Sequence, residues 1–153
     1  MSGWKAYVNE MMKNGSCSQA AVCGAYDGTI WAKTPGFNLY EYEICQDKLE
    51  GETEILTVCE PELLLEPFKN NGTMVSDCGM HLNKEKWFIV NYNPDMNSIY
   101  LKRPKGGACL VKTTQVVLVG FFDEGTVKNK ALNAGNCNKD LEILAEKLRN
   151  VGY

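Results

Sequence analysis

Residues 80–122 decide the fold, and they read MHLNKEKWFIVNYNPDMNSIYLKRPKGGACLVKTTQVVLVGFF. Apolar and β-branched runs alternate here with short turn signals such as Asn93-Pro94-Asp95 and Pro104-Lys105-Gly106-Gly107. The spacing predicts strands over residues 80–82, 86–92, 98–101, 108–113 and 115–122. We therefore expect an antiparallel meander of about five strands.

The segment before this meander predicts a helix followed by a β-hairpin. Apolar residues at helical spacing are Trp4, Tyr7, Val8, Met11 and Met12. Asn14-Gly15 ends this pattern, because both residues tolerate the left-handed backbone conformation. Two runs on either side of Asp27-Gly28 then predict a hairpin that ends near Trp31.

The chain ends in a second amphipathic helix. Its apolar stripe consists of Leu141, Leu144, Ala145, Leu148 and Val151. Asn136 or Asn138 is placed to cap its first turn. Residues 38–70 are acidic and carry Leu63-Leu64-Leu65 between two prolines, a composition that indicates one or two short helices.

These elements define one α+β domain over residues 1–153. We predict a central antiparallel meander sheet with the N- and C-terminal helices packed on one face and short helices on the other. The 153 residues, of which 44% are hydrophobic, suffice for a single core.

The composition indicates in which compartment the protein is found and whether it holds a metal or a cofactor. The apolar runs are far shorter than the ~20 residues that span a bilayer, and the start of the chain does not resemble a secretory leader. We therefore expect a cytoplasmic protein. The seven cysteines are odd in number and His81 is the single histidine, so we expect reduced thiols, no metal site and no cofactor.

Charge is segregated along the chain, although the net charge is only −3. Residues 41–66 carry nine acidic side chains against Lys48, whereas residues 96–122 carry no acid. The basic side chains of that second stretch are Lys102, Arg103, Lys105 and Lys112. A net-acidic chain is not a general nucleic-acid binder. The basic stretch suits an acidic protein surface or an anionic lipid headgroup, unless it is an ordinary solvated face.

The sequence offers little for catalysis. It lacks the nucleophile-elbow, phosphate-loop and dinucleotide-binding motifs. His81 lies within a predicted strand, where a structural role is more usual than a catalytic one. Cys137 near a helix start could have a lowered pKa, although a small buried core residue is the more ordinary interpretation. We therefore expect no enzyme.

Aromatic residues gather near the two ends of the chain. Trp4 and Tyr7 belong to the first helix, Trp31 to the hairpin, and Tyr153 is the last residue. If the terminal helices pack side by side, these rings could line a groove that accepts polyproline II ligands. The alternative is that they belong to the core.

Several short motifs together resemble the profilin family, and most of all its animal form. The motifs are residues 2–8 (SGWKAYV), Gly15-x-Cys17 followed by Ala20-Ala21, Gly28-x-x-Trp31-Ala32, Lys105-Gly106-Gly107, residues 112–115 (KTTQ) and residues 135–138 (GNCN). The resemblance covers both chain ends and the later strands. It implies a non-enzymatic, monomeric cytoskeletal protein that binds monomeric actin, promotes nucleotide exchange on actin and recruits to proline-rich proteins.

The resemblance also implies three sets of binding residues. Those for polyproline are Trp4, Tyr7, Trp31, Lys147, Leu148 and Tyr153. Those for actin are Lys86, Ile89, Arg103, Lys112, Thr113, Gly135, Asn138 and Lys139. Those for phosphoinositide headgroups are Lys102, Arg103, Lys105 and Lys112. Many animal profilins have a histidine at the position of Lys147.

The resemblance fades between about residues 48 and 75, where we expect an acidic insertion. One alternative is therefore a module of the same fold that keeps the polyproline groove but binds actin weakly or not at all. A second alternative is a thiol-dependent redox protein that uses Cys137 or Cys17.

Overall fold

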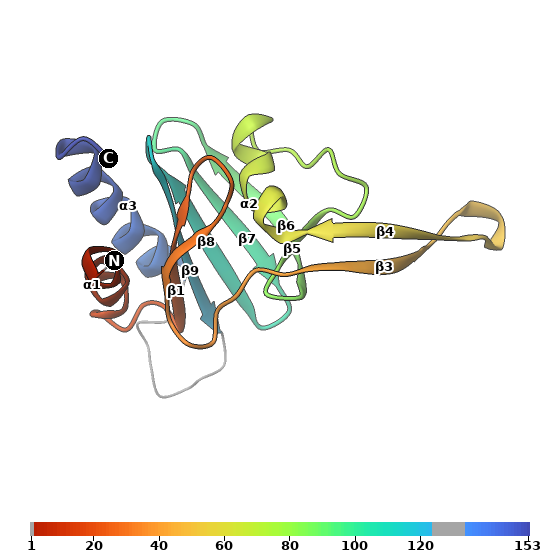
Figure 1. Cartoon of the computed structure of the whole chain (residues 1–153), viewed down its shortest axis with the longest axis horizontal. Coiled ribbons are helices and arrows are strands. Elements are labelled where there is room, and N and C mark those ends of the chain that lie inside the picture. Colours follow the sequence, from red (N-terminus) through yellow and green to blue (C-terminus); the bar gives the residue numbers. More distant parts are fainter. Residues whose placement is uncertain (1, 124–133) are drawn as a thin grey trace.

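In the computed structural model, which describes residues 2–123 and 134–153, the centre of the molecule is a seven-stranded antiparallel sheet (Figure 1). Its strands are β1 (Gln19–Gly24), β2 (Ile30–Lys33), β5 (Met80–Leu82), β6 (Glu85–Asn93), β7 (Ser98–Arg103), β8 (Gly106–Lys112) and β9 (Val116–Asp123). Their order in the sheet is β2-β1-β9-β8-β7-β6-β5. The five-strand meander is confirmed, and the N-terminal hairpin extends it because β1 pairs with β9.

Two helices, α1 (Ser2–Met12) and α3 (Ala134–Asn150), cover one face of this sheet, as Figure 1 shows. Val8 and Met11 of α1 and Leu141 and Leu148 of α3 are buried there against the strands. Helix α2 (Glu60–Lys69) packs on the other face. The predicted fold class is therefore confirmed. None of the helices in the described part of the chain is long and apolar enough to cross a membrane.

The core on the α2 face forms around Trp87, which is 1% exposed. Its ring lies 4.9 Å from that of Phe121, centroid to centroid, and its indole N–H donates to the Leu82 carbonyl over 3.0 Å. The triple leucine of α2, residues 63–65, is buried in the same cluster. Both faces of the sheet are thus covered near its centre, which explains why β8 and β9 are buried along almost their whole length.

The prediction of one or two short helices over residues 38–70 is confirmed by α2, but the same stretch also contains two strands that were not predicted. Strands β3 (Glu41–Asp47) and β4 (Thr53–Cys59) form a separate two-stranded ribbon, joined by a short 3₁₀ turn, η1 (Leu49–Gly51). This ribbon projects from the body of the molecule (Figure 1). Acidic and apolar residues alternate over residues 41–44 of β3, and that alternation is a strand signal. The acidic composition and the neighbouring leucines concealed it.

A buried carboxylate fixes the root of this ribbon. Glu60, at the start of α2, is fully buried. Its carboxylate accepts hydrogen bonds from the backbone N–H groups of Tyr40 (3.0 Å), Asn83 (2.8 Å) and Lys84 (2.8 Å) and from the Tyr42 hydroxyl (2.7 Å). One side chain therefore joins the ribbon, α2 and the turn between β5 and β6.

Two expectations about the last helix are wrong. Asn136 and Asn138 lie within α3, so neither caps its start. Val151 lies beyond the end of α3 and is 64% exposed, so the buried stripe ends at Leu148. The apolar residues keep a helical spacing up to Val151, but the helix itself ends at Asn150.

Candidate functional site

An aromatic groove lies where the two ends of the chain meet. The ring of Trp4 lies 5.1 Å from that of Trp31 and 5.3 Å from those of Tyr7 and Tyr153, centroid to centroid. Trp31 is 39% exposed and Tyr153 38% exposed, so the rings are open to water rather than sealed in the core. The open groove measures about 480 Å³ and is lined by Trp4, Trp31, Tyr153 and Gln115.

The last turn of the chain positions Tyr153. Gly152 adopts a left-handed conformation, with φ of +94°. The N–H of Gly152 donates to the Arg149 carbonyl over 3.1 Å, and the N–H of Tyr153 donates to the Leu148 carbonyl over 2.9 Å. These two bonds form a Schellman motif, which ends α3 and turns the chain back. The Tyr153 carbonyl then accepts from the N–H of Gln115 over 2.9 Å.

Close packing positions the other rings. Any side chain at Gly24 would place its Cβ 3.1 Å from the Trp31 ring, so this glycine leaves room for the indole. The ammonium group of Lys5 on α1 donates to the Lys33 carbonyl of β2 over 2.7 Å. Helix α1 is thereby tied to the strand that carries Trp31.

Only some of the six residues predicted for this groove line it. Trp4, Trp31 and Tyr153 line it, and Tyr7 supports Trp4 from the side. Leu148 is fully buried and offers no contact surface, which corrects that prediction.

Lys147 is also misplaced in the prediction. Its ammonium group is 3.8 Å from Glu10 of α1, in a small hollow between the two terminal helices, and it does not line the groove. Gln115 was missed, because its position depends on the turn before β9 and no motif marks it.

The groove suits an extended apolar ligand with free carbonyl groups. Flat rings offer large contact areas at low entropic cost, since each ring has few rotatable bonds. A polyproline II segment has no internal hydrogen bonds, so its carbonyls are available to donors. Tryptophan N–H groups and the Gln115 side-chain amide are donors of that kind.

A second exposed surface lies on β6 and β7. Phe88 is 60% exposed and Val90 55% exposed. Phe88 lies opposite Lys102 in the antiparallel pair, and the ammonium group of Lys86 is 6.0 Å from the Phe88 ring centroid. Ile89 instead lies opposite Leu101 and packs against the core on the α2 face. In a strand a shift of one residue changes the face, so Phe88 is more exposed than the predicted Ile89, which is half-buried. The prediction that Ile89 contacts actin stays a prediction.

Arg103 does not provide a free charge. Its guanidinium group pairs with Glu85 and with Asp123 and lies 4.9 Å from the Trp87 ring centroid. These contacts neutralise the cation and hold it against the body of the protein. The predictions that Arg103 binds actin and phosphoinositide are therefore not supported.

Thr113 is 3% exposed, and its hydroxyl group accepts a hydrogen bond from the N–H of Val116 over 3.2 Å. It stabilises the turn before β9 and presents no surface to a partner. The prediction of Thr113 as an actin contact is therefore corrected as well.

The predicted cationic cluster is divided between two ends of the sheet. Lys102 and Lys105 are exposed near the turn between β7 and β8. Lys112 is half-buried at the opposite end of β8, five residues beyond Gly107, which corresponds to roughly 17 Å of strand. One headgroup cannot contact all of these residues.

Gly135 and Lys139 are exposed in the first turns of α3. Asn138 is half-buried, and its side-chain amide donates to Glu142 over 2.7 Å. The buried Cys137 beside them lies close to Gly120, which is in register with Cys109 and Tyr100 across the sheet. The start of α3 is therefore near the part of β7 that leads to Lys102.

The two candidate redox thiols, Cys17 and Cys137, lie together in the core. The sulfur atoms of Cys17 and Cys137 are 3.3 Å apart and buried in the core beneath α3. A hydrogen bond with Cys137, followed by burial, raises the pKa of Cys17, and a hydrogen bond with Cys109 raises the pKa of Cys137. The expectation of a lowered pKa at Cys137 is wrong, because the thiol faces the sheet rather than an exposed helix start.

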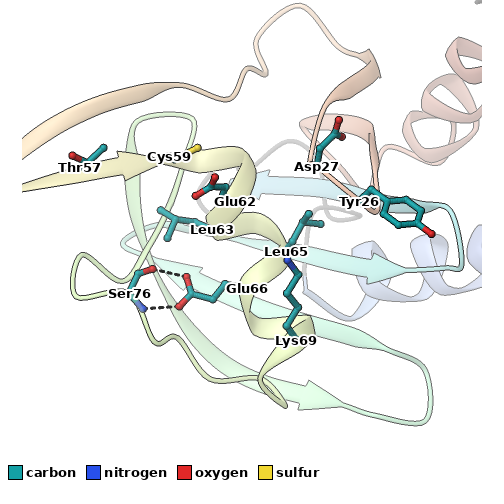
Figure 2. Close-up of a pocket in the computed structure, with 10 residues that line it drawn as sticks. All are labelled: Tyr26, Asp27, Thr57, Cys59, Glu62, Leu63, Leu65, Glu66, Lys69 and Ser76. Carbon is teal, nitrogen blue, oxygen red and sulfur yellow. Dashed lines mark hydrogen bonds between the residues drawn. The ribbon is translucent and has the colours of Figure 1, made fainter.

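A further hollow of about 590 Å³ contains none of the predicted residues (Figure 2). It lies between α2 and the turn that joins β1 to β2. Tyr26 and Asp27 form one wall, and Thr57 and Cys59 of β4 form another. Glu66 on α2 accepts hydrogen bonds from the backbone N–H and the hydroxyl group of Ser76 at the edge of the hollow.

Comparison with known proteins agrees with this architecture. The profilin family model matches residues 2–153. The profilin of Tetrahymena pyriformis is 35% identical, and the match covers 100% of both chains. The crystal structure of Acanthamoeba castellanii profilin II superposes with a TM-score of 0.71 at 25% identity, covering 98% of this chain and 99% of that one.

Mouse profilin IIa, in complex with a double repeat from the FH1 domain of mDia1, has the same fold. Its TM-score is 0.65 at 19% identity, with 99% of each chain covered. The expected likeness to the animal form is therefore corrected, because the Tetrahymena protein is more similar in sequence than this animal one. Sequence, fold and the groove between the terminal helices agree, and the chain belongs to the profilin family.

Proposed function

We propose that this chain binds actin monomers on one surface and proline-rich segments in the aromatic groove, and that it thereby regulates actin polymerisation in the cytoplasm. The observation that carries the proposal is the meeting of Trp4, Trp31 and Tyr153 at one open groove. These rings come from both ends of the chain and from β2, and they remain open to water. The complex of mouse profilin IIa with an FH1 double repeat supports it.

The small size of the groove predicts that a single proline segment binds weakly. Each ring that becomes buried contributes about 1.5–3 kcal/mol. Association costs about 4–15 kcal/mol in lost freedom of motion. A short proline segment should therefore bind loosely, and tandem proline tracts should bind more tightly because they raise the effective concentration.

The surface around Phe88 supports the actin part of the proposal. Exposed apolar side chains, Phe88 and Val90, lie beside the cations Lys86 and Lys102. An apolar centre with a charged rim is the usual anatomy of a protein interface. The cations complement the acidic surface of actin and would accelerate encounter. Gly135 and Lys139 extend this surface, and promotion of nucleotide exchange would follow from docking there.

Phosphoinositide binding is a weaker part of the proposal. Only Lys102 and Lys105 lie close together and exposed. Each basic residue near an anionic leaflet contributes about 1 kcal/mol, so this pair gives modest attraction. We also propose that the whole chain is one profilin domain, in which the acidic insertion around residues 48–75 includes β4 and α2.

A capture experiment tests both surfaces together. The chain should bind immobilised polyproline, and actin monomers should co-elute with it. If the chain does not bind the resin, the aromatic groove is not a polyproline site. If the chain is captured but actin does not co-elute, the protein is a polyproline module that does not bind actin productively.

A charge-reversed variant, Lys102→Glu with Lys139→Glu, should reduce actin co-elution while leaving proline capture intact, because both exposed cations belong to the surface around Phe88. The matched control is Lys13→Glu with Lys69→Glu, which changes the net charge equally at positions outside the proposed surface. Equal loss in both variants would show that net charge, rather than this surface, controls actin binding.

A further inference from the structure

The β3–β4 ribbon has one face that no other part of the described chain covers. Cross-strand pairs on this outer face are Glu41–Cys59, Glu43–Thr57, Cys45–Ile55 and Asp47–Thr53. All of these side chains except Cys59 are exposed, and Ile55 is 66% exposed. The opposite face carries Ile44 and Leu56, which pack against the core near the root. The ribbon is therefore anchored by one face and presents the other to solvent.

The charge of the ribbon is strongly one-sided. Residues 41–59 contain six acidic side chains and one basic one, Lys48. The ammonium group of Lys48 pairs with Glu54 over 3.3 Å, on the inner side of the ribbon. Neither Glu43 nor Asp47 has an ion-pair partner within residues 2–123 and 134–153, which leaves two outward carboxylates uncompensated beside the apolar pair Cys45–Ile55.

The outer face continues into the hollow at the root of the ribbon. Thr57 and Cys59 belong to both, and the opposite wall carries Asp27 and the almost fully exposed ring of Tyr26 (Figure 2). A hydrogen bond from the backbone N–H of Thr29 lowers the pKa of Asp27, so this carboxylate stays ionised. The hollow is lined by three carboxylates, those of Asp27, Glu62 and Glu66, against the one ammonium group of Lys69, and this balance favours a guanidinium or ammonium group.

We propose that the outer face of the ribbon and the hollow at its root form a docking surface for an extended basic segment of a partner protein. Arginine or lysine side chains of that segment pair with Glu43 and Asp47, apolar side chains cover Ile55, and one cation enters the hollow toward Asp27. This goes beyond the proposed function.

Charge decides between the possible occupants. A second copy of this chain would bring Glu43 and Asp47 against the same carboxylates, and like charges at an interface are unfavourable. Actin would meet the cations of the Phe88 surface, so a surface of the opposite sign is not suited to the same acidic partner. A basic partner distinct from actin therefore fits the ribbon best.

The probe is a fluorescent peptide of about twelve residues, called the arginine–valine peptide, with the repeat arginine-serine-valine-serine. In an extended segment its arginine and valine side chains then point to the same face, and that length can follow the ribbon from tip to root. Binding is measured by fluorescence anisotropy on the full chain. The peptide should bind, and its affinity should fall as salt rises from about 50 to about 300 mM. A glutamate–valine peptide of the same length should not bind.

The decisive variant is Glu43→Gln with Asp47→Asn, which removes two charges and preserves the shape of both side chains. It should lower the affinity for the arginine–valine peptide by about fivefold or more. The matched control, Asp95→Asn with Glu146→Gln, removes two exposed charges elsewhere and should leave the affinity within about twofold. Capture on immobilised polyproline verifies that each variant is folded.

Three results would overturn the proposal. Equal weakening in both variants would mean that the peptide responds only to net charge. Loss of actin co-elution in the ribbon variant, with peptide affinity unchanged, would assign the ribbon to the actin surface. Dimers of the parent chain in sedimentation velocity, absent in the ribbon variant, would make a second copy the occupant.

Discussion

The backbone N–H of Gln115 donates to the carbonyl oxygen of Tyr153 over 2.9 Å, which joins the last residue of the chain to the turn before β9. The same Gln115 accepts through its own carbonyl from the N–H of Ala25, at the start of the hairpin turn, over 2.9 Å. Two backbone bonds at one residue thus hold the C-terminal ring beside the hairpin that carries Trp31.

Replacement of Trp31 by alanine should weaken decaproline binding by about tenfold or more, because one ring contributes about 1.5–3 kcal/mol when buried. Titration by calorimetry measures the change. Phe88→Ala is the matched control, since that ring is 60% exposed and lies on β6, away from the groove. Equal losses for both variants would contradict the assignment of the groove.

Substitution of Gly152 by alanine should reduce proline affinity although residue 152 does not line the groove. The φ of +94° is strained for any residue with a Cβ, and relief of that strain would move Tyr153 away from Trp4. Gly3→Ala is the control, because Gly3 lies within α1 with open space around its Cα. Unchanged affinity in Gly152→Ala would show that the Schellman turn does not position Tyr153.

Phe88→Ala should weaken actin binding by about tenfold while leaving the free energy of unfolding within about 0.5 kcal/mol of the parent value. Actin co-elution and urea unfolding measure the two quantities. Ile89→Ala should do the reverse, since Ile89 packs against the core and loses stability when truncated. Weaker actin binding in Ile89→Ala but not in Phe88→Ala would support the prediction that Ile89 contacts actin.

Glu60→Gln should lower the free energy of unfolding by roughly 1–3 kcal/mol. The amide replaces an acceptor oxygen by a donor, so at least one of the N–H groups of Asn83 and Lys84 loses its bond to the buried side chain. Glu62→Gln on the same helix is the control, because Glu62 is exposed. Denaturation by urea compares the two, and equal stabilities would show that the buried carboxylate contributes nothing.

Stability should fall as pH drops through the range where free histidine titrates, near pH 6.5. Burial lowers the pKa of His81, so the folded chain binds fewer protons there than the unfolded chain. That difference favours the folded state above the unfolded pKa and is lost as pH falls. Thermal melts between about pH 7.5 and 5.5 should show a smaller decrease for His81→Gln. Identical slopes would rule out His81 as the source.

Local sequence patterns determined most of the elements of this protein. Strand periodicity and turn residues between 80 and 122 gave the meander, and the apolar stripe through Leu141 and Leu148 gave the last helix, because these signals lie within a few residues of one another. The ribbon was missed because its alternation competed with acidic composition.

Only the tertiary structure decided which side chains are available for binding. Trp4, Trp31 and Tyr153 form one groove because β1 pairs with β9 and a glycine turn ends α3. Both features bring together segments that are distant in the sequence. Whether Phe88 or Ile89 faces solvent depends on strand register, and the neutralisation of Arg103 depends on acids 18 and 20 residues away. Residue type and spacing carry the chemistry, whereas exposure and pairing arise from contacts between segments that are distant in sequence.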